Sequence, residues 1–340
     1  MTGEPLLAIE DLEVVFRLRR GLVATVLRRP ARMVRAVDGI RVEVAAGELV
    51  ALVGESGCGK TTTALATLGL APPAGGTVRI EGQDLASLPP AEARALRRRV
   101  QMIFQDPYES LDPRFSVRRT VIEPLLVHHV KGDREALARG ALEKVGLSPA
   151  DRYLDRLPHE LSGGQRQRVA IAAALVLQPV LLVADEPVSM LDTSVRAGVL
   201  ELLAELRRDG MGILMITHDL STAAHYADRI SVMYLGRIVE EGSARAVVGD
   251  PRHPYTRALV AAVPRSDGRP RDMALMPKGE TPDAAAVPSG CRFHPRCPLA
   301  QSRCEHEDPP LRQLALGRRA ACVLLKPDPV PEGVVPTAAP

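Results

Sequence analysis

The chain has 340 residues, of which 46% are hydrophobic and 25% are charged. This length suits one large domain with an appendage or two ordinary domains, and the composition is that of a globular protein. The net charge of +3 gives no argument for nucleic-acid binding, and no apolar run approaches the roughly eighteen residues that a membrane span needs.

The N-terminus carries acidic residues among its apolar ones and lacks the layout of a signal peptide, so we expect a cytosolic chain. Strands are expected at 6–16 and 40–48. Between positions 17 and 35 lie seven arginines, which indicate an inserted surface loop or short basic helix. Contact of this segment with lipid headgroups or a membrane subunit is the alternative.

A buried strand, a glycine-rich turn and a helix follow over 49–70. A strand is expected around 97–104, and the pattern at 134–145 predicts an amphipathic helix.

Farther on, helices are predicted over 161–177 and 195–210, and buried strands over 180–187 and 211–220. Residues 230–242 have the pattern of a hairpin at the sheet edge. Apolar strands that alternate with helices indicate an α/β fold with a parallel sheet covered on both faces. From about 251 the sequence becomes irregular and proline-rich, and 327–340 is expected to be disordered.

The stretch GESGCGKT fits the phosphate-binding loop pattern G-x-x-x-x-G-K-[ST], with a strand before it and a helix after it. Its glycines allow backbone N–H groups to curl around phosphate oxygens, Lys60 supplies a positive charge, and Thr61 offers a hydroxyl to Mg²⁺. Cys58 occupies a free position of the motif. The predicted ATP-binding residues of this stretch are Gly54, Glu55, Ser56, Gly57, Cys58, Gly59, Lys60, Thr61 and Thr62.

Two carboxylates, Asp185 and Glu186, end the predicted buried strand at 180–187. A carboxylate at this end of a parallel strand, next to a phosphate loop, is placed to hold Mg²⁺. This favours Asp185 as a magnesium ligand and Glu186 as the general base that aligns a water for attack on the γ-phosphate.

LSGGQ at 161–165 lies between these motifs, and with it the chain resembles the nucleotide-binding subunits of ATP-binding cassette (ABC) transporters over residues 6 to about 248. The resemblance implies a P-loop NTPase fold with a RecA-like parallel-sheet core, an antiparallel β edge and a helical subdomain inserted at about 106–170. It places the ATPase domain at 1–250.

The same resemblance implies roles for individual residues. Gln105 would join the magnesium shell, His218 would contact the γ-phosphate and the catalytic carboxylate, and Phe16 would stack on adenine. The signature residues would approach ATP bound to an opposing subunit, because one chain cannot fold this cradle onto its own phosphate loop. They are Ser162, Gly163, Gly164 and Gln165.

Three further stretches, at 104–114, 250–264 and 288–304, resemble the oligopeptide, dipeptide and nickel import branch of the family, and the insertion after Phe16 is typical of its F-type subunit. The resemblance implies a second cassette, usually a paralogue, two transmembrane permease subunits and an external peptide-binding protein. The chain would then sit peripherally on the cytoplasmic face of the membrane. Import of nickel or another small solute is an alternative.

A soluble ABC ATPase that acts on nucleic acid is a second alternative. The single cassette and the ordinary spacing of about 100 residues between Lys60 and the signature disfavour it. No nucleic-acid partner is therefore expected.

Four of the five cysteines crowd the irregular C-terminal region, with the spacing C-x5-C-x6-C-x17-C. They are Cys291, Cys297, Cys304 and Cys322. Four thiolates can bind Zn²⁺ or a [4Fe–4S] cluster, and the spacing does not choose between them. Buried free thiols are the alternative. The resemblance to the peptide branch, whose subunits carry an iron–sulfur cluster there, favours iron in a C-terminal domain at 251–326.

Overall fold

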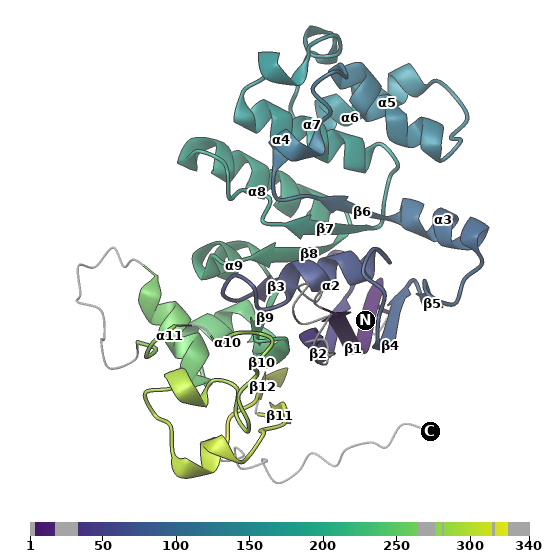
Figure 1. The fold of residues 1–340 in the computed structure, drawn as a ribbon. Helices are drawn as coiled ribbons and strands as arrows, with labels where there is room; N and C mark the ends of the chain where they lie inside the picture. The colour runs from purple at the N-terminus through teal and green to yellow at the C-terminus, as the bar shows by residue number, and fades with distance from the viewer. Residues whose placement is uncertain (1–3, 18–32, 264–275, 281, 315–316, 326–340) are drawn as a thin grey trace, which may run out of the picture.

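The computed structural model describes residues 4–17, 33–263, 276–280, 282–314 and 317–325. Most of the arginine-rich segment and the predicted disordered tail lie outside these residues. The described residues form two sheets with helices around them (Figure 1). None of the helices in the described ranges has the length and apolar character needed to cross a bilayer.

The larger sheet has a parallel centre, as the alternation of strands and helices predicts. Its eight strands run in the order β11-β12-β10-β9-β3-β8-β7-β6. The parallel strands are β3 Leu49–Val53, β6 Val100–Ile103, β7 Leu181–Asp185, β8 Gly212–Thr217 and β9 Arg229–Tyr234. Strands β3, β7 and β8 are buried along their whole length, which explains their uninterrupted apolar sequences.

Alternate residues of β3 enter two different hydrophobic cores. Leu49 and Val53 pack into a core that includes residues of α5, α6, α7 and α8, whereas Val50 and Leu52 pack into one that includes residues of α2 and α3. A strand sends successive side chains to opposite faces, so these two cores lie on the two faces of the sheet. The helices are α2 Lys60–Thr67, α3 Pro90–Arg99, α5 Val117–Val127, α6 Arg134–Lys144, α7 Gly163–Leu175 and α8 Thr193–Arg208.

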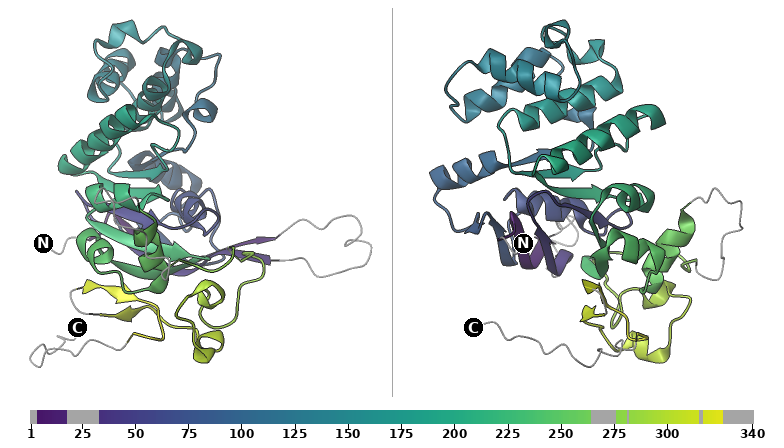
Figure 2. Two further views of the ribbon diagram at one scale, coloured as in Figure 1. Left: turned by 90° about the vertical axis from the view of Figure 1, so that its left-hand side faces the viewer. Right: turned by 180° about the vertical axis from the view of Figure 1, so that it is seen from behind.

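The second sheet is antiparallel and has the order β2-β1-β4-β5. Its strands are β1 Leu7–Arg17, β2 Met33–Val44, β4 Gly75–Ile80 and β5 Gln83–Asp84. Strand β2 begins earlier than predicted, so residues 33–35 of the arginine-rich segment belong to a strand rather than to a loop or helix. In Figure 2 the β1–β2 hairpin projects away from the body of the molecule.

A helical region between β6 and β7 occupies the top of Figure 1. It contains α4 Pro107–Ser110, α5, α6, the short 3-10 turns η1 Ala150–Arg152 and η2 Pro158–Glu160, and α7. Helix α6 confirms the prediction at 134–145. The strand expected at 97–104 is shorter than predicted, because α3 continues to Arg99 and β6 starts at Val100.

The predicted hairpin at 230–242 exists as β9 and β10 Arg237–Ser243, but its position at the sheet edge is wrong. Strand β12 Arg319–Ala320 pairs with β10, and β11 Arg312–Gln313 pairs with β12. The C-terminal region thus covers backbone groups that an edge strand would expose. Its other elements are α10 Ala244–Gly249, α11 Pro254–Ala262, η4 His294–Arg296 and η5 Ser302–Glu305.

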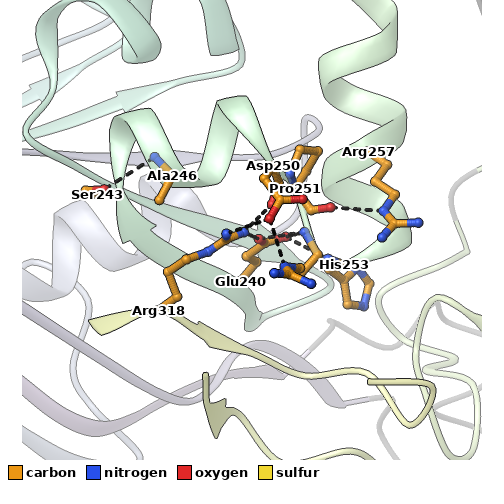
Figure 3. A network of polar contacts seen from close by, with 9 residues as sticks. Glu240, Ser243, Ala246, Asp250, Pro251, His253, Arg257 and Arg318 are labelled. Carbon is orange, nitrogen blue, oxygen red and sulfur yellow. Dashed lines mark hydrogen bonds and ion pairs between the residues drawn. The ribbon is translucent and has the colours of Figure 1, made fainter. Parts of the chain in front are cut away.

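A buried polar network ties this C-terminal region to β10 (Figure 3). The carboxylate of Glu240 is fully buried and accepts hydrogen bonds from Nη2 of Arg318 at 2.9 Å and from the backbone N–H groups of Arg252 and His253. Arg318 also reaches the backbone oxygen of Asp250. A buried charge persists only when it is paired in this way, so the network fixes the start of α11 against the sheet.

Candidate nucleotide-binding site

The phosphate-loop motif forms the turn between β3 and α2, as predicted. Gly59 has a φ of 112°, and a Cβ atom at this position would lie 2.1 Å from the backbone oxygen of Ala36 on β2. Only glycine fits this combination of left-handed backbone and close approach. The backbone N–H groups at the start of α2 therefore face the space above the loop.

Lys60 folds back onto the loop. Its side chain is almost wholly buried, and Nζ donates hydrogen bonds to the carbonyl oxygens of Gly54 at 2.8 Å and Glu55 at 2.9 Å. Its third proton faces Sγ of Cys58 at 3.9 Å, a long contact to a weak acceptor that a phosphate oxygen can replace. Cys58, its near neighbour, is buried, and burial raises the pKa of its thiol.

Asp185 lies at the end of β7 with its carboxyl group buried. Burial raises its pKa, an effect that the hydroxyl of Thr61 and the charge of Lys60 oppose and that Glu186 adds to. Its Oδ1 is one of the few buried side-chain atoms, among the described residues, without a hydrogen-bond partner. This orphaned carboxylate oxygen, which has no hydrogen-bond partner within the described part of the chain, lies beside a threonine hydroxyl. Both are oxygen ligands of the kind that Mg²⁺ prefers.

Glu186 is held by residues from two other strand ends. Its Oε2 accepts a hydrogen bond from Nε2 of Gln105 at 3.0 Å, and its Oε1 lies 3.0 Å from Nδ1 of His218. The backbone at Glu186 has a φ of 45°, which is uncommon outside glycine and occurs often at functional sites. The structure therefore brings together the predicted base, glutamine and histidine.

A cavity of about 240 Å³ joins the phosphate loop to Gln105 and Glu186, whereas Asp185 and His218 do not line it. It is lined by Ala36, Ser56, Gly57, Gly59, Lys60, Thr61, Thr62, Gln105 and Glu186. Of these, the sequence reasoning missed only Ala36, whose contribution is a backbone oxygen that no motif reports. Phe16, which pairs with Val34 on β2 and is 43% exposed, lies outside this lining, and its adenine role stays a prediction.

The signature residues lie at the start of α7 and do not line this cavity. Ser162 caps the helix: its Oγ accepts from the backbone N–H of Gln165, and Oε1 of Gln165 accepts from the backbone N–H of Ser162. A Cβ atom on Gly164 would lie 2.2 Å from Cγ1 of Val195 on α8. The reciprocal hydrogen bonds between Ser162 and Gln165 fix the start of this helix, and none of the signature residues lines the cavity over the chain's own phosphate loop.

The four C-terminal cysteines gather in the structure. All are free thiols, and burial raises the pKa of Cys291 to about 11, with Cys322, Cys304 and Cys297 adding to the effect. Within the described residues, however, no three or more His, Cys, Asp or Glu side chains are arranged to hold a metal ion. The thiols are thus near neighbours without forming a set of ligands.

Comparison with known proteins identifies the family and the fold of the chain. Residues 37–189 match the family model described as "ABC transporter", and residues 239–304 match "Oligopeptide/dipeptide transporter, C-terminal region". The dimeric, ADP- and phosphate-bound structure of the ATP-binding cassette MJ0796 is 26% identical, with a TM-score of 0.61, over 70% of this chain and 99% of that one. The fold and site therefore define an ATP-binding cassette.

Curated relatives identify the branch of the ABC family to which the chain belongs. The probable peptide ABC transporter ATP-binding protein y4tS of Sinorhizobium fredii is 45% identical over 96% of this chain and 91% of the relative. The oligopeptide transport ATP-binding protein AppF of Bacillus subtilis is 40% identical over 94% and 98%. The chain belongs to the ABC transporter ATP-binding proteins that carry the oligopeptide/dipeptide transporter C-terminal region.

Proposed function

We propose that this chain hydrolyses ATP to power a membrane importer of oligopeptides or dipeptides. The observation that carries the ATPase part is the carboxylate of Glu186, held between Gln105 and His218 at the mouth of the phosphate-loop cavity. The peptide part is supported by the match at 239–304 and by the names of the relatives.

In this proposal Glu186 is the general base. Each of its carboxylate oxygens has one partner, Gln105 on Oε2 and His218 on Oε1, and can still accept a hydrogen bond from a water that approaches the γ-phosphate. Gln105 and His218 would keep the carboxylate oriented toward that water.

Lys60 and the loop N–H groups would bind the β- and γ-phosphates. Thr61 and the orphaned oxygen of Asp185 would hold Mg²⁺, with Gln105 as a further ligand, and the ion would neutralise charge on the phosphates.

The signature residues would act on ATP bound to a second cassette. Their position outside the chain's own cavity supports a site shared between two subunits, and the neighbour MJ0796 is described as dimeric. We further propose that the partner cassette is a paralogue, and that two permease subunits and an external peptide-binding protein complete the importer. The chain would then lie on the cytoplasmic face of the membrane.

The test is reconstitution of the chain with its partner cassette and permeases in proteoliposomes. We expect ATP hydrolysis that rises when a peptide-loaded binding protein is added, together with uptake of labelled peptide. Uptake of nickel but not peptide, or hydrolysis that responds to RNA or DNA but not to the permeases, would overturn the peptide assignment.

The cysteine-rich region is proposed to bind a metal group, an iron–sulfur cluster before zinc. Four neighbouring free thiols supply suitable donor chemistry, but they do not form a ligand set in the structure, so no step of hydrolysis is assigned to the group. Elemental analysis and visible absorbance of the anaerobically purified chain, beside a Cys297→Ser variant, test this. Colourless protein with zinc rejects iron, and metal-free protein rejects both.

A further inference from the structure

Glu55, the second residue of the phosphate loop, bonds within the loop through its carbonyl oxygen and to the C-terminal region through its backbone N–H and its carboxylate. Its carbonyl oxygen accepts from Nζ of Lys60 at 2.9 Å and from the backbone N–H of Cys58 at 3.4 Å. Its backbone N–H donates to the hydroxyl of Tyr255 at 2.9 Å, and its carboxylate pairs with Arg296. The residue that holds the loop lysine is thus itself held by the C-terminal region.

Tyr255 can fix its partner because its own ring is immobilised. It lies in the first turn of α11, is fully buried, and packs against the rings of Tyr234 at 4.7 Å and Phe293 at 5.4 Å between centroids. Tyr234 ends β9, so this aromatic cluster joins the sheet, α11 and segment 291–297. The packing of its ring therefore holds the hydroxyl of Tyr255 in a fixed position against the backbone N–H of Glu55.

Arg296 makes a two-pronged contact. Nη1 lies 2.7 Å from Oε2 of Glu55 and Nη2 lies 3.2 Å from Oε1, and the arginine side chain is 10% exposed. Burial disfavours the guanidinium charge, but Glu55 outweighs it and the pKa of Arg296 is raised. Bidentate, charge-assisted pairs of this kind are strong and directional.

The segment that carries Arg296 is anchored at both ends. The backbone N–H of Cys291 donates to the carbonyl of Cys304 at 2.9 Å, and the carbonyl of Arg296 accepts from Lys278 at 2.9 Å. The side chain of Cys297 packs into the core that Phe293 also enters. A change in this segment is therefore transmitted to Glu55 rather than absorbed locally.

We propose that Tyr255 and Arg296 are positioning residues of the ATP site, through which the C-terminal region sets the affinity of the phosphate loop for nucleotide. Neither residue lines the cavity, and neither does Glu55, so both act through the contact of Glu55 with Lys60, which does line it. A loop held in its phosphate-binding shape loses less conformational freedom when the ligand arrives, and so binds more tightly. The inference rests on the proposed nucleotide site.

The experiment measures the dissociation constant of Mg²⁺–trinitrophenyl-ATP by fluorescence, and kcat in the assembled complex. In Arg296→Met and Tyr255→Phe we expect the dissociation constant to rise about fivefold to tenfold, the scale of one lost hydrogen bond. The value of kcat at saturating ATP should change by less than about twofold, because the groups around Glu186 are untouched. Tyr255→Phe keeps the ring, so it stays informative if Arg296→Met folds poorly.

Further variants distinguish a role in positioning the phosphate loop from a role in general stability of the fold. Arg296→Lys, which keeps the charge, should recover part of the affinity. Glu55→Gln/Arg296→Met should bind no more weakly than Arg296→Met alone, because both changes break the same pair. Arg319→Met is the control, since it removes another arginine–glutamate pair of the C-terminal region, with Glu241 on β10, and should leave the dissociation constant unchanged below its melting temperature.

The outcomes distinguish this inference from the proposed function. If nucleotide binds equally to wild type and Lys60→Met, the nucleotide site itself is wrong. If binding needs Lys60 but is unchanged in Arg296→Met and Tyr255→Phe, only the positioning role is overturned. If Arg319→Met weakens binding as much as Arg296→Met does, the effect is general destabilisation and the inference fails.

Discussion

The phosphate loop and segment 291–297 are both short irregular stretches, but they are held in different ways. The loop is shaped by its own backbone, by glycines and by Lys60, all within eight residues. Segment 291–297 is held by side chains that reach across the chain, such as Arg296, which lies 241 positions from Glu55. Function that resides in local backbone geometry is visible in a motif, whereas function that depends on such distant pairs is not.

The largest expected effect is on the rate of hydrolysis, and it comes from a change in the nucleotide-binding motifs. Glu186→Gln removes the proposed proton acceptor but keeps an oxygen near His218, so hydrolysis should fall by about 10²–10⁴-fold while nucleotide still binds. Phosphate release by the assembled complex measures it. The control is Glu201→Gln on α8, whose carboxylate makes an exposed pair with Arg208 and should not affect turnover. A Glu186→Gln complex that turns over like wild type contradicts the assignment.

The nucleotide-site motifs could be placed from the sequence because each coincides with a strand end or a helix start. Asp185, Glu186 and His218 follow buried parallel strands, and such strands bring their carboxyl ends to one edge of the sheet. The parallel sheet followed from the alternation of apolar strands with helices, and the helix at 134–145 followed from its amphipathic periodicity. Local sequence patterns were sufficient where the backbone defines the site.

Long-range pairing could not be predicted in this way. Strand β12 is two residues long and carries no strand signal, yet it moves β10 away from the sheet edge. The links of Tyr255 and Arg296 to Glu55 were missed because each lies in the part of the chain that looked irregular. Arginine, tyrosine and glutamate at such separations are ordinary surface residues until tertiary packing buries them.

The second prediction tests the C-terminal side through stability. Arg318→Met leaves the buried carboxylate of Glu240 with backbone partners only, so unfolding should be easier by about 3–5 kcal/mol. Denaturant titration measures it. Replacing both residues, as Glu240→Gln/Arg318→Met, should return much of the loss. Arg208→Met, which breaks the exposed pair with Glu201 on α8, should cost at most about 1 kcal/mol. Equal losses in the two single variants would show that burial does not decide the effect.

The third prediction asks whether local packing explains the glycine at position 164 of the signature motif. In Gly164→Ala the new methyl group would meet Cγ1 of Val195 at 2.2 Å, and helices α7 and α8 should lose about 1–3 kcal/mol of packing. Val195→Ala in the same chain should restore stability. Gly163→Ala is the control, because its nearest neighbours lie at 3.8 Å or more. If Val195→Ala does not rescue the variant, steric contact is not why glycine stands at 164.

The smallest effect concerns pH and again involves the C-terminal region. His253 is fully buried, and burial lowers its pKa to about 3, with a hydrogen bond to the Ala321 backbone opposing the shift and Arg257 adding to it. An unfolded histidine titrates near about 6.5. Between these values the unfolded chain binds the extra proton, so this contribution to stability is complete above about pH 6.5 and is lost as pH falls toward 3.

The free energy of unfolding is measured at pH 7.5, 6 and 5 for wild type and for His253→Asn. The difference between the two proteins gives the contribution of the proton on His253. Asparagine can still accept the hydrogen bond that Nδ1 of His253 receives from the backbone N–H of Tyr255, so the helix cap is kept. Below about pH 6.5 the wild type should lose up to about 1.4 kcal/mol per pH unit more than the variant. If the two pH curves are parallel, His253 binds its proton in the folded protein as it does in the unfolded chain. Burial of the imidazole between Glu240 and α11 would then not lower its pKa, and the prediction would be wrong.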